Sequence, residues 1–243
     1  PLPPLPEQKR IATILDKADA LRRKDGELLK KYDELAQSIF IDMFGDPVKN
    51  EKGWEVKRFG ELFNSRLGKM LDSKKQLGGK RYKYLGNSNV QWFKIDCDNL
   101  LEMEFNEKDT ETFELKKGDI LICEGGEAGR SAIWDKDDSS IYFQKAIHRA
   151  RPLKENIIPE YFVYLFWFLV KRNALKDYIS TSTISHLTGE KIVTIPIPIP
   201  TIKLQQDFKK SILLISKHKE VFGKINSLNI FQSLLQQAFK GEL

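Results

Sequence analysis

The 243-residue sequence contains only two cysteines and three histidines, the residues that most often build disulfide frameworks and zinc sites. Cys97 and Cys123 stand 26 positions apart, and no histidine is spaced to complete a metal site with them. We therefore expect no metal ligands and no disulfide framework. This cysteine usage indicates a reduced, cytoplasmic protein.

Long hydrophobic runs are absent as well. The longest one, Tyr161–Val170, has ten residues, which is about half of what a membrane-spanning helix requires. It predicts a buried helix, and we expect no signal peptide and no membrane partner. Because the first residue is Pro1 and not methionine, we expect the sequence to be a processed product or a piece of a longer chain.

The sequence also lacks the motifs of the common enzyme classes. It has no Walker-type phosphate loop, no Gly-x-Gly-x-x-Gly after a strand, and no Asn-Pro-Pro-aromatic segment of the amino-methyltransferases. The glycine-rich stretch Cys123–Arg130 lacks these spacings and is interpreted as a tight loop. His148 and His186 draw attention only because each adjoins a polar segment. We expect no catalytic residues and no cofactor.

What the sequence does contain is a repeat of its own beginning. With an offset of 197 residues, Pro3 falls on Pro200 and Gln8 falls on Gln205. Each copy is a proline-rich lead-in followed by a helical pattern. Proline suits an extended lead-in and the first turn of a helix but not a helix interior. The repeat therefore predicts a rigid arm and a long helix at each end of the sequence.

The two helical patterns run over Pro6–Phe44 and Lys203–Phe239. Their apolar positions recur mostly at intervals of three, four and seven, which is typical of a coiled-coil seam. Neither stripe has a local partner, so we predict that the two helices pack antiparallel on each other. The alternatives are pairing with copies from another chain, or two ordinary helices of a globular core. The predicted seam consists of Ile11, Leu21, Leu28, Leu35, Ile212, Ile225 and Leu235.

The middle of the sequence has a different pattern. Short runs of β-forming residues alternate with turn signals such as Gly78-Gly79 and Asp137-Asp138, and one helix is predicted over about 159–179. This predicts an α+β fold in which a globular mixed α/β domain is inserted between two long antiparallel coiled-coil helices. The predicted divisions are 1–53 for the arm and first helix, 54–200 for the inserted domain, and 201–243 for the second helix.

Charge is unevenly distributed along the inserted domain. Residues 66–94 carry eight Lys/Arg and one Asp, residues 96–119 carry nine Asp/Glu and three Lys, and residues 130–154 carry six Lys/Arg and three Asp. The first basic stretch also contains aromatic and amide side chains. Cations hold phosphates and amides read base edges, so the pattern favours nucleic-acid binding over a merely solvated face. We predict that the basic stretches share one face and that the acidic stretch lies off it.

Several segments together resemble a known family. The stretches "PLPPLPEQKRIATILDKADAL" and "LAQSIFIDMFGDP" resemble the first helical region of the specificity subunit of type I restriction-modification enzymes, and "FQSLLQQAFKGEL" resembles the end of the second. The inserted domain resembles that family's target recognition domain through Trp54–Leu62, Lys116–Arg130 and Thr181–Pro200. The resemblance covers nearly the whole chain.

The resemblance implies a function without catalysis. In this family two recognition domains alternate with two helices that pair as a ruler, and each domain reads half of a bipartite DNA site. The partners implied are double-stranded DNA, methyltransferase (M) subunits and restriction (R) subunits. The sequence departs from the family pattern because both helices are present with only one recognition domain. It therefore resembles the second half of a specificity subunit, or a half-subunit that forms a homodimer.

Side-chain type and position select the candidate DNA contacts. Cations are the expected phosphate contacts, whereas polar side chains are the expected base readers, with Tyr82 or Trp92 packing beside them. The predicted phosphate contacts are Lys69, Lys74, Lys75, Lys80, Arg81, Arg130 and Lys145. The predicted readers are Asn87, Asn89, Gln91, Gln144, Arg149, Thr183 and Ser185. Two other functions remain open: a coiled-coil scaffold that binds proteins but no DNA, and the recognition domain of a fused restriction-methyltransferase enzyme.

Overall fold

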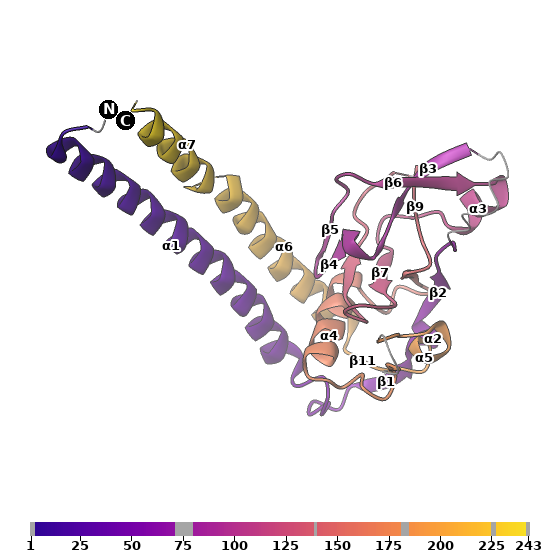
Figure 1. The fold of residues 1–243 in the computed structure, drawn as a ribbon. Coiled ribbons are helices and arrows are strands. Elements are labelled where there is room, and N and C mark those ends of the chain that lie inside the picture. The colour runs from indigo at the N-terminus through magenta and orange to yellow at the C-terminus, as the bar shows by residue number, and fades with distance from the viewer. Residues whose placement is uncertain (1–2, 71–79, 139, 181–184, 225–226, 242–243) are drawn as a thin grey trace. The chain divides into compact units, whose positions relative to one another are not determined.

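The computed structural model describes residues 3–70, 80–138, 140–180, 185–224 and 227–241 (Figure 1). The chain forms two compact units. We call residues 1–39 together with 210–243 the helical unit, and residues 40–209 the mixed unit. No helix within the described ranges is long and apolar enough to cross a membrane.

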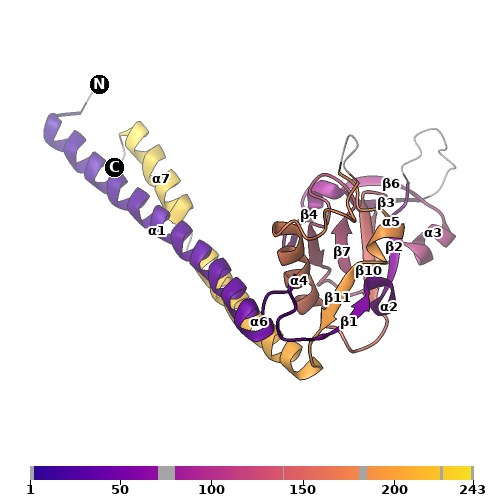
Figure 2. The same cartoon turned by 90° about the horizontal axis from the view of Figure 1, so that it is seen from below.

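The helical unit is built from most of α1 (Leu5–Phe44), from α6 (Ile202–Lys224) beyond its first two turns, and from α7 (Ser227–Lys240). Figures 1 and 2 show α1 running alongside α6 and α7. The first helix begins one residue before the predicted Pro6 and ends at the predicted Phe44. The predicted second helix, Lys203–Phe239, is described as the two helices α6 and α7.

Contacts within the helical unit fix the direction of the pair. Lys219 Nζ lies 2.5 Å from Asp33 Oδ1, whereas the Arg22 guanidinium lies 5.7 Å from the Phe231 ring. From the first contact to the second, the residue number falls on α1, from 33 to 22, and rises on the partner helices, from 219 to 231. The helices are therefore antiparallel. The predicted antiparallel packing is confirmed.

The seam agrees only in part with the predicted residues. Leu21 and Leu35 are 47% and 46% exposed, so their placement in the seam is wrong. The buried positions of this part of α1 are Ala18 and Ala36. They are 18 residues apart, which is five turns of 3.6 residues, so they lie on one face of the helix. Small side chains at the contact allow two helices to approach closely.

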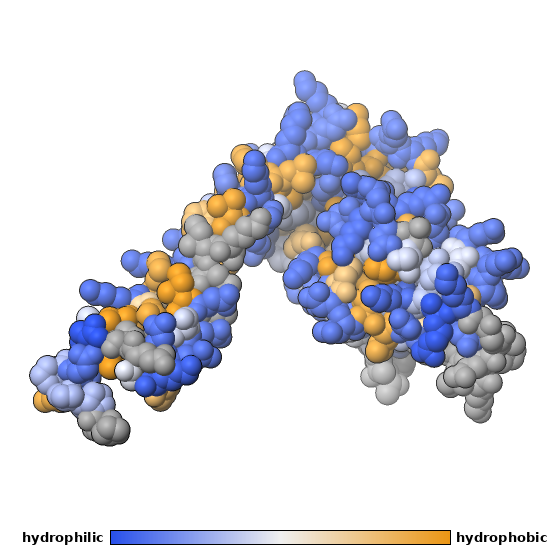
Figure 3. Space-filling model, turned by 90° about the horizontal axis from the view of Figure 1, so that it is seen from above, coloured by the Kyte–Doolittle hydropathy of each residue, from blue (hydrophilic) through white to orange (hydrophobic). Residues whose placement is uncertain are grey.

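The other predicted seam positions vary in burial. Ile212 is buried, whereas Ile11, Leu28 and Leu235 are half-buried. Ile225 lies outside the described residues. Figure 3 shows apolar side chains exposed among hydrophilic ones along the helical unit; Leu213 and Leu214 are both more than half exposed.

The proline repeat has a structural counterpart at both helix starts. Gln8 Nε2 donates to the carbonyl of Pro3 at 2.7 Å, and Gln205 Nε2 donates to that of Pro200 at 2.8 Å. These two pairs are related by the same offset of 197 residues. In each copy the glutamine satisfies a carbonyl in the proline segment just before the helix, where no helical N–H can reach it. The repeated sequence therefore encodes a repeated helix start.

The described residues of the mixed unit form four sheets. Most of its strand pairs are antiparallel, and β3 with β9 is the parallel pair among those described. The two-stranded sheets are β1 (Glu55–Arg58) with β11 (Pro196–Ile199), and β4 (Val90–Gln91) with β5 (Lys94–Ile95). The four-stranded sheet has the order β2 (Phe63–Leu67), β10 (Ile147–Pro152), β7 (Ile120–Cys123) and β8 (Ser131–Ile133). The three-stranded sheet has the order β6 (Leu101–Phe105), β3 (Lys80–Leu85) and β9 (Ile141–Phe143).

Helix α4 contributes seven buried apolar side chains to the core of the mixed unit. It spans Pro159–Lys171, starts with proline in its first turn, and buries most of the long apolar run, as predicted. The predicted helix continued to residue 179, but after Arg172 the chain turns at Asn173, whose φ is +55°. The part of the unit that the structure describes also has the short helices α2 (Phe59–Leu62), η1 (Asn87–Asn89), α3 (Glu107–Thr112) and α5 (Gly189–Ile192).

Aromatic rings tie the ends of the long helices into this core. Phe40 stacks on Phe168 with ring centroids 4.9 Å apart, and it meets Phe208 edge-on at 5.5 Å. The Tyr161 hydroxyl, which is buried against the same rings, donates to the Pro198 carbonyl at 2.8 Å. Gln205 is fully buried and accepts from the Ile158 N–H at 2.8 Å. The last turn of α1 and the first turns of α6 are thus part of the mixed unit.

The acidic stretch does not lie apart from the basic one. Strand β6 pairs directly with β3, so that Arg81 is opposite Glu104 and Lys83 is opposite Glu102. Lys69 Nζ also lies 2.5 Å from Asp109 Oδ2. The predicted separation of these stretches is wrong because opposite charges face each other across neighbouring strands, which favours their pairing.

Candidate nucleic-acid interface

A polar hollow of about 900 Å³ opens on the mixed unit around η1 and the end of β9. It brings together five of the predicted DNA-binding residues from three separate parts of the chain: Asn87, Asn89, Gln91, Arg130 and Gln144. The other residues that line it are Tyr84, Gly86, Ser88, Asp96, Asp98, Asn99 and Leu101. Amide, guanidinium and carboxylate groups together match the donors and acceptors on base edges.

Asn89 forms the turn at the base of this hollow. Its Oδ1 accepts from the Gly86 N–H at 2.8 Å, and its Nδ2 donates to the Asp96 carbonyl at 3.0 Å. The Asp96 N–H returns a hydrogen bond to the Asn89 carbonyl at 2.7 Å. Because both ends of its amide are used inside the protein, Asn89 shapes the hollow and is poorly suited to reading a base.

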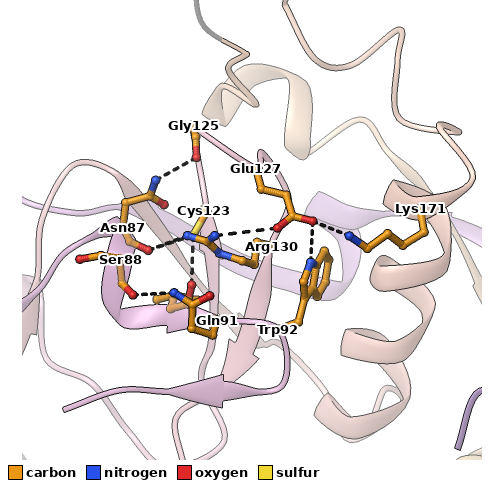
Figure 4. Close-up of polar contacts among 10 residues, drawn as sticks. Asn87, Ser88, Gln91, Trp92, Cys123, Gly125, Glu127, Arg130 and Lys171 are labelled. Carbon is orange, nitrogen blue, oxygen red and sulfur yellow. Dashed lines mark hydrogen bonds and ion pairs between the residues drawn. The ribbon is translucent and has the colours of Figure 1, made fainter. Parts of the chain in front are cut away.

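Asn87 connects η1 to the glycine-rich loop at residues 124–130. Its Nδ2 donates to the Gly125 carbonyl at 3.1 Å, and its own carbonyl accepts from Arg130 Nη2 at 2.9 Å (Figure 4). Asn87 Oδ1 and Arg130 Nε are buried without a hydrogen-bond partner in the described structure. The loop thus holds the η1 turn in place.

Glu127 anchors this loop from its other side. Its Oε1 accepts from Trp92 Nε1 at 2.8 Å and from Lys171 Nζ at 2.6 Å, while Oε2 lies 3.8 Å from Arg130 Nη1 (Figure 4). Burial would raise the pKa of Glu127, but hydrogen bonds from Lys171 and Trp92 outweigh it and hold the pKa below its ordinary value. Sequence reasoning identified the loop as tight but missed Glu127 and Lys171, because their partners are distant in the chain.

Gln144 lies directly after β9, and Gly68 allows that position. The Lys69 N–H donates to the Phe143 carbonyl at 3.1 Å, and the Lys145 N–H donates to the Lys69 carbonyl at 2.8 Å. A Cβ on Gly68 would stand 2.3 Å from the carbonyl oxygen of Gln144, so only glycine permits this approach. The segment therefore joins the ends of two sheets and fixes the backbone of Gln144.

Two predicted contacts are used inside the protein. Lys69 donates to the Glu104 carbonyl at 2.6 Å as well as pairing with Asp109. Arg149 is buried, and its guanidinium donates to the Glu114 carbonyl at 2.8 Å. Burial and then the positive charge of Arg151 lower the pKa of Arg149. We leave Lys69 and Arg149 out of the candidate interface because Lys69 Nζ and Arg149 Nη1 already have partners inside the protein, and Arg149 Nε is buried.

The remaining predicted contacts fall into three groups. Lys80, Arg81 and Lys145 are exposed; Lys94, which was not among the predicted contacts, is also exposed in β5. Tyr82 is half-buried, edge-on to Tyr142 with ring centroids 5.2 Å apart, and Ser185 is half-buried next to the glycine-rich loop. Lys74, Lys75 and Thr183 lie outside the described residues.

His148 is fully buried in β10 behind this surface. Its Nε2 lies 2.9 Å from the Leu187 carbonyl and its Nδ1 is buried without a partner among the described residues. Burial lowers the pKa of His148 below its ordinary value, while the Leu187 hydrogen bond and the Glu124 charge act in the opposite direction. The folded protein therefore favours the neutral imidazole.

This burial predicts a pH dependence of stability. The unfolded state binds a proton at His148 more readily, so the contribution to stability is complete above about pH 6.5 and is lost as the pH falls. The free energy of unfolding of His148→Gln should fall less steeply between pH 7 and 5 than that of the wild type, by at most about 1.4 kcal/mol per pH unit. Denaturant unfolding at several pH values measures both slopes, with His186→Gln, at an exposed histidine, as the control. Equal slopes for His148→Gln and the wild type would contradict the prediction.

Comparison with known proteins identifies the family. Residues 51–215 match the family model of the type I restriction modification DNA specificity domain. The chain is 25% identical over its full length to the type I restriction enzyme EcoKI specificity subunit of Escherichia coli (strain K12), and covers 57% of that protein. It is 23% identical over 92% of its length to the MjaVIII specificity subunit of Methanocaldococcus jannaschii, and covers 56% of that protein.

Solved structures share the fold. The chain superposes on the HsdS subunit from Thermoanaerobacter tengcongensis with a TM-score of 0.56 at 18% identity, covering 100% of this chain and 60% of that one. The S subunit from M. genitalium gives a TM-score of 0.58 at 19% identity, over 96% of this chain and 60% of that one. The chain thus spans somewhat more than half of the length of the relatives it matches. On the match to the family model, the chain belongs to the family of type I restriction modification DNA specificity domains.

Proposed function

We propose that the mixed unit recognises one half of a bipartite sequence in double-stranded DNA. In this proposal the chain performs no catalysis and positions methyltransferase (M) and restriction (R) subunits of a type I restriction-modification complex. Membership of the DNA specificity family supports the proposal, as do the relatives named as specificity subunits.

One observation supports the assignment of DNA recognition to a particular surface. The polar hollow gathers residues from three separate segments, at 84–101, 130 and 144. Its amides and carboxylates can distinguish bases, because adenine, guanine and cytosine present different donors and acceptors in the major groove. We propose this hollow as the readout surface of the mixed unit.

Exposed lysines near the readout segments would supply affinity. Lys80 begins β3, Lys94 lies in β5, and Lys145 follows Gln144, and all three are exposed. Cations at such positions contact phosphates and release counterions, which gives binding of any sequence but a strong dependence on salt. The amides of the hollow would then add the sequence preference.

Binding measurements on the assembled complex test this assignment. Replacing Lys80, Lys94 and Lys145 together by Ala should weaken binding to all duplexes and reduce the slope of log K against log salt by up to about 3. The control replaces Lys108, Lys116 and Lys117 by Ala, which removes the same charge from exposed positions away from the hollow's lining. Equal effects from both triple variants would place the phosphate contacts elsewhere. A wild-type complex without DNA affinity at low salt would favour a protein-binding scaffold.

We also propose that a second recognition unit completes the assembly, supplied by a second copy of this chain or by a further part of a longer one. The two glutamines of the repeat support this. The Gln205 side chain bonds to Pro200 and also to Ile158 and Asn156 of the mixed unit, whereas the Gln8 side chain bonds only to Pro3 among the contacts of the described residues. Light scattering across a concentration series measures the homodimer, and a strict monomer at tens of micromolar would exclude it.

A further inference from the structure

Gln144 differs from the other amides of the hollow. Asn89 uses both ends of its amide, Asn87 donates to Gly125, and Gln91 Nε2 donates to the Ser88 carbonyl at 2.7 Å. Within the described structure the side-chain amide of Gln144 has no hydrogen-bond partner, and the side chain is partly exposed in the hollow. An unpartnered amide in such a place retains its full capacity to donate and accept.

The backbone of Gln144 is held on several sides. Its N–H donates to the Leu85 carbonyl at 3.1 Å, and its carbonyl accepts from the Ile147 N–H at 3.0 Å. It also forms a parallel bridge with Lys69. A side chain on a fixed backbone loses less conformational freedom on binding than one on a mobile loop, so more of its interaction energy appears as selectivity.

Gly86 leaves room for the amide. A Cβ built on Gly86 would stand 3.0 Å from Gln144 Nε2 and 3.6 Å from Asn89 Oδ1. The backbone of Gly86 is extended, with φ −101° and ψ 177°, so alanine can adopt it without strain. The absence of a side chain at Gly86 therefore determines where the Gln144 amide can lie.

We propose that Gln144 is a specificity-determining residue that recognises an adenine in the major groove. Its Oε1 accepts a hydrogen bond from the adenine N6 amino group, and its Nε2 donates to N7, the bidentate pairing that an amide forms with adenine. This inference rests on the proposed function, because it assigns one base contact within the proposed readout surface.

Selection from a randomised duplex library by the assembled complex tests the inference. The wild type should select a site that contains an adenine whose replacement weakens binding about 10- to 100-fold. Gln144→Ala should lose the preference at that single position and keep the salt dependence. Gln144→Arg should shift the preference there to guanine, and Gln144→Glu should shift it to cytosine. The same substitutions at Gln206, an exposed glutamine of α6 outside the hollow, should leave the selected site unchanged.

The outcomes separate the two proposals. A wild-type complex that selects no sequence would overturn the proposed function itself. A wild type that selects a sequence, with every Gln144 variant selecting the same one, would overturn only the role of Gln144. If the Gln144 variants fail to fold, the Gly86→Ala variant tests the role of Gln144 instead, because its new Cβ displaces the Gln144 amide without removing it. That variant should weaken the preference for adenine at one position, and an unaltered preference would reject the inference.

Discussion

Replacing Asp119 by Ala should lower the free energy of unfolding of the mixed unit by about 3 kcal/mol. The Asp119 side chain is 1% exposed and accepts two hydrogen bonds of 2.7 Å from Arg151, one on each oxygen. It also accepts from the Lys116 N–H at 2.7 Å. Removing one partner of a buried ion pair leaves the other uncompensated. Arg151 remains 31% exposed, so the expected loss is at the lower end of the usual range. Denaturant unfolding measures it.

Asp137→Ala is the matched control for this substitution. Asp137 pairs with Lys117 at 3.4 Å, but both side chains are largely exposed. Water solvates both partners after the change, so the loss should not exceed about 0.5 kcal/mol. If Asp119→Ala cost no more than Asp137→Ala, the buried pair would contribute nothing beyond surface electrostatics, contrary to our expectation.

Replacing Gly68 by Ala should destabilise the mixed unit by about 3 kcal/mol, at the upper end of the cost of overpacking. The new Cβ would stand 2.3 Å from the carbonyl oxygen of Gln144, 2.5 Å from its carbonyl carbon and 2.7 Å from the Phe143 carbonyl oxygen. These are backbone atoms, which cannot rotate away as a flexible side chain would. The bridge between Lys69 and Gln144 must open, and the free energy of unfolding should fall.

Gly189→Ala is the control in the same unit. Its Cβ would meet only His148 Cε1, at an ordinary contact distance of 3.8 Å. Gly189 begins α5, where alanine is the better helix former, so stability should change little or rise slightly. Thermal unfolding of both variants compares them directly. A Gly68→Ala protein as stable as Gly189→Ala would show that the two sheets can separate there at no cost.

The strongest parts of the fold prediction rest on local periodicity. The helices at both ends, their antiparallel pairing and the buried helix within Tyr161–Val170 all follow from spacings that chain geometry imposes. The sequence repeat corresponds to a repeated structure, because the side chains of Gln8 and Gln205 form the same hydrogen bond to a proline carbonyl. The resemblance to type I specificity subunits is confirmed by the family match.

What the sequence could not supply was register. The predicted seam followed the large residues Leu21 and Leu35, whereas the contact buries Ala18 and Ala36. Alanine contributes little to a hydrophobic pattern, yet it is favoured where two backbones approach closely. An error of one position on a helix rotates a side chain by about 100°, which is enough to move it from the seam to the solvent.

In the candidate site, too, the sequence did not reveal which side chains are partners in the folded protein. Sequence reasoning placed Lys69 and Arg149 on DNA, but Lys69 pairs with Asp109 of α3 and Arg149 donates to the backbone carbonyl of Glu114. These partners lie 35 to 40 residues away in the chain, so no local pattern specifies them. Gln144 and Arg130 were selected from side-chain type and position alone, and both line the hollow. Whether these residues contact DNA remains a prediction.

The pairing of Asp33 with Lys219 has a consequence for synthesis on the ribosome. The two residues are 186 positions apart, so at 5–20 residues per second α1 waits about 10–40 s for its partner helix. During that interval the helix must stay soluble with its seam uncovered. The buried positions in the part of α1 that pairs with α6 and α7 are alanines, and its salt bridges Arg22–Asp19 and Arg23–Asp19 are local to one helical turn. These alanines and ion pairs add little to the apolar surface that waits uncovered, so the side chains that must be kept from aggregating in a nascent chain are the larger ones, such as Ile11 and Leu28.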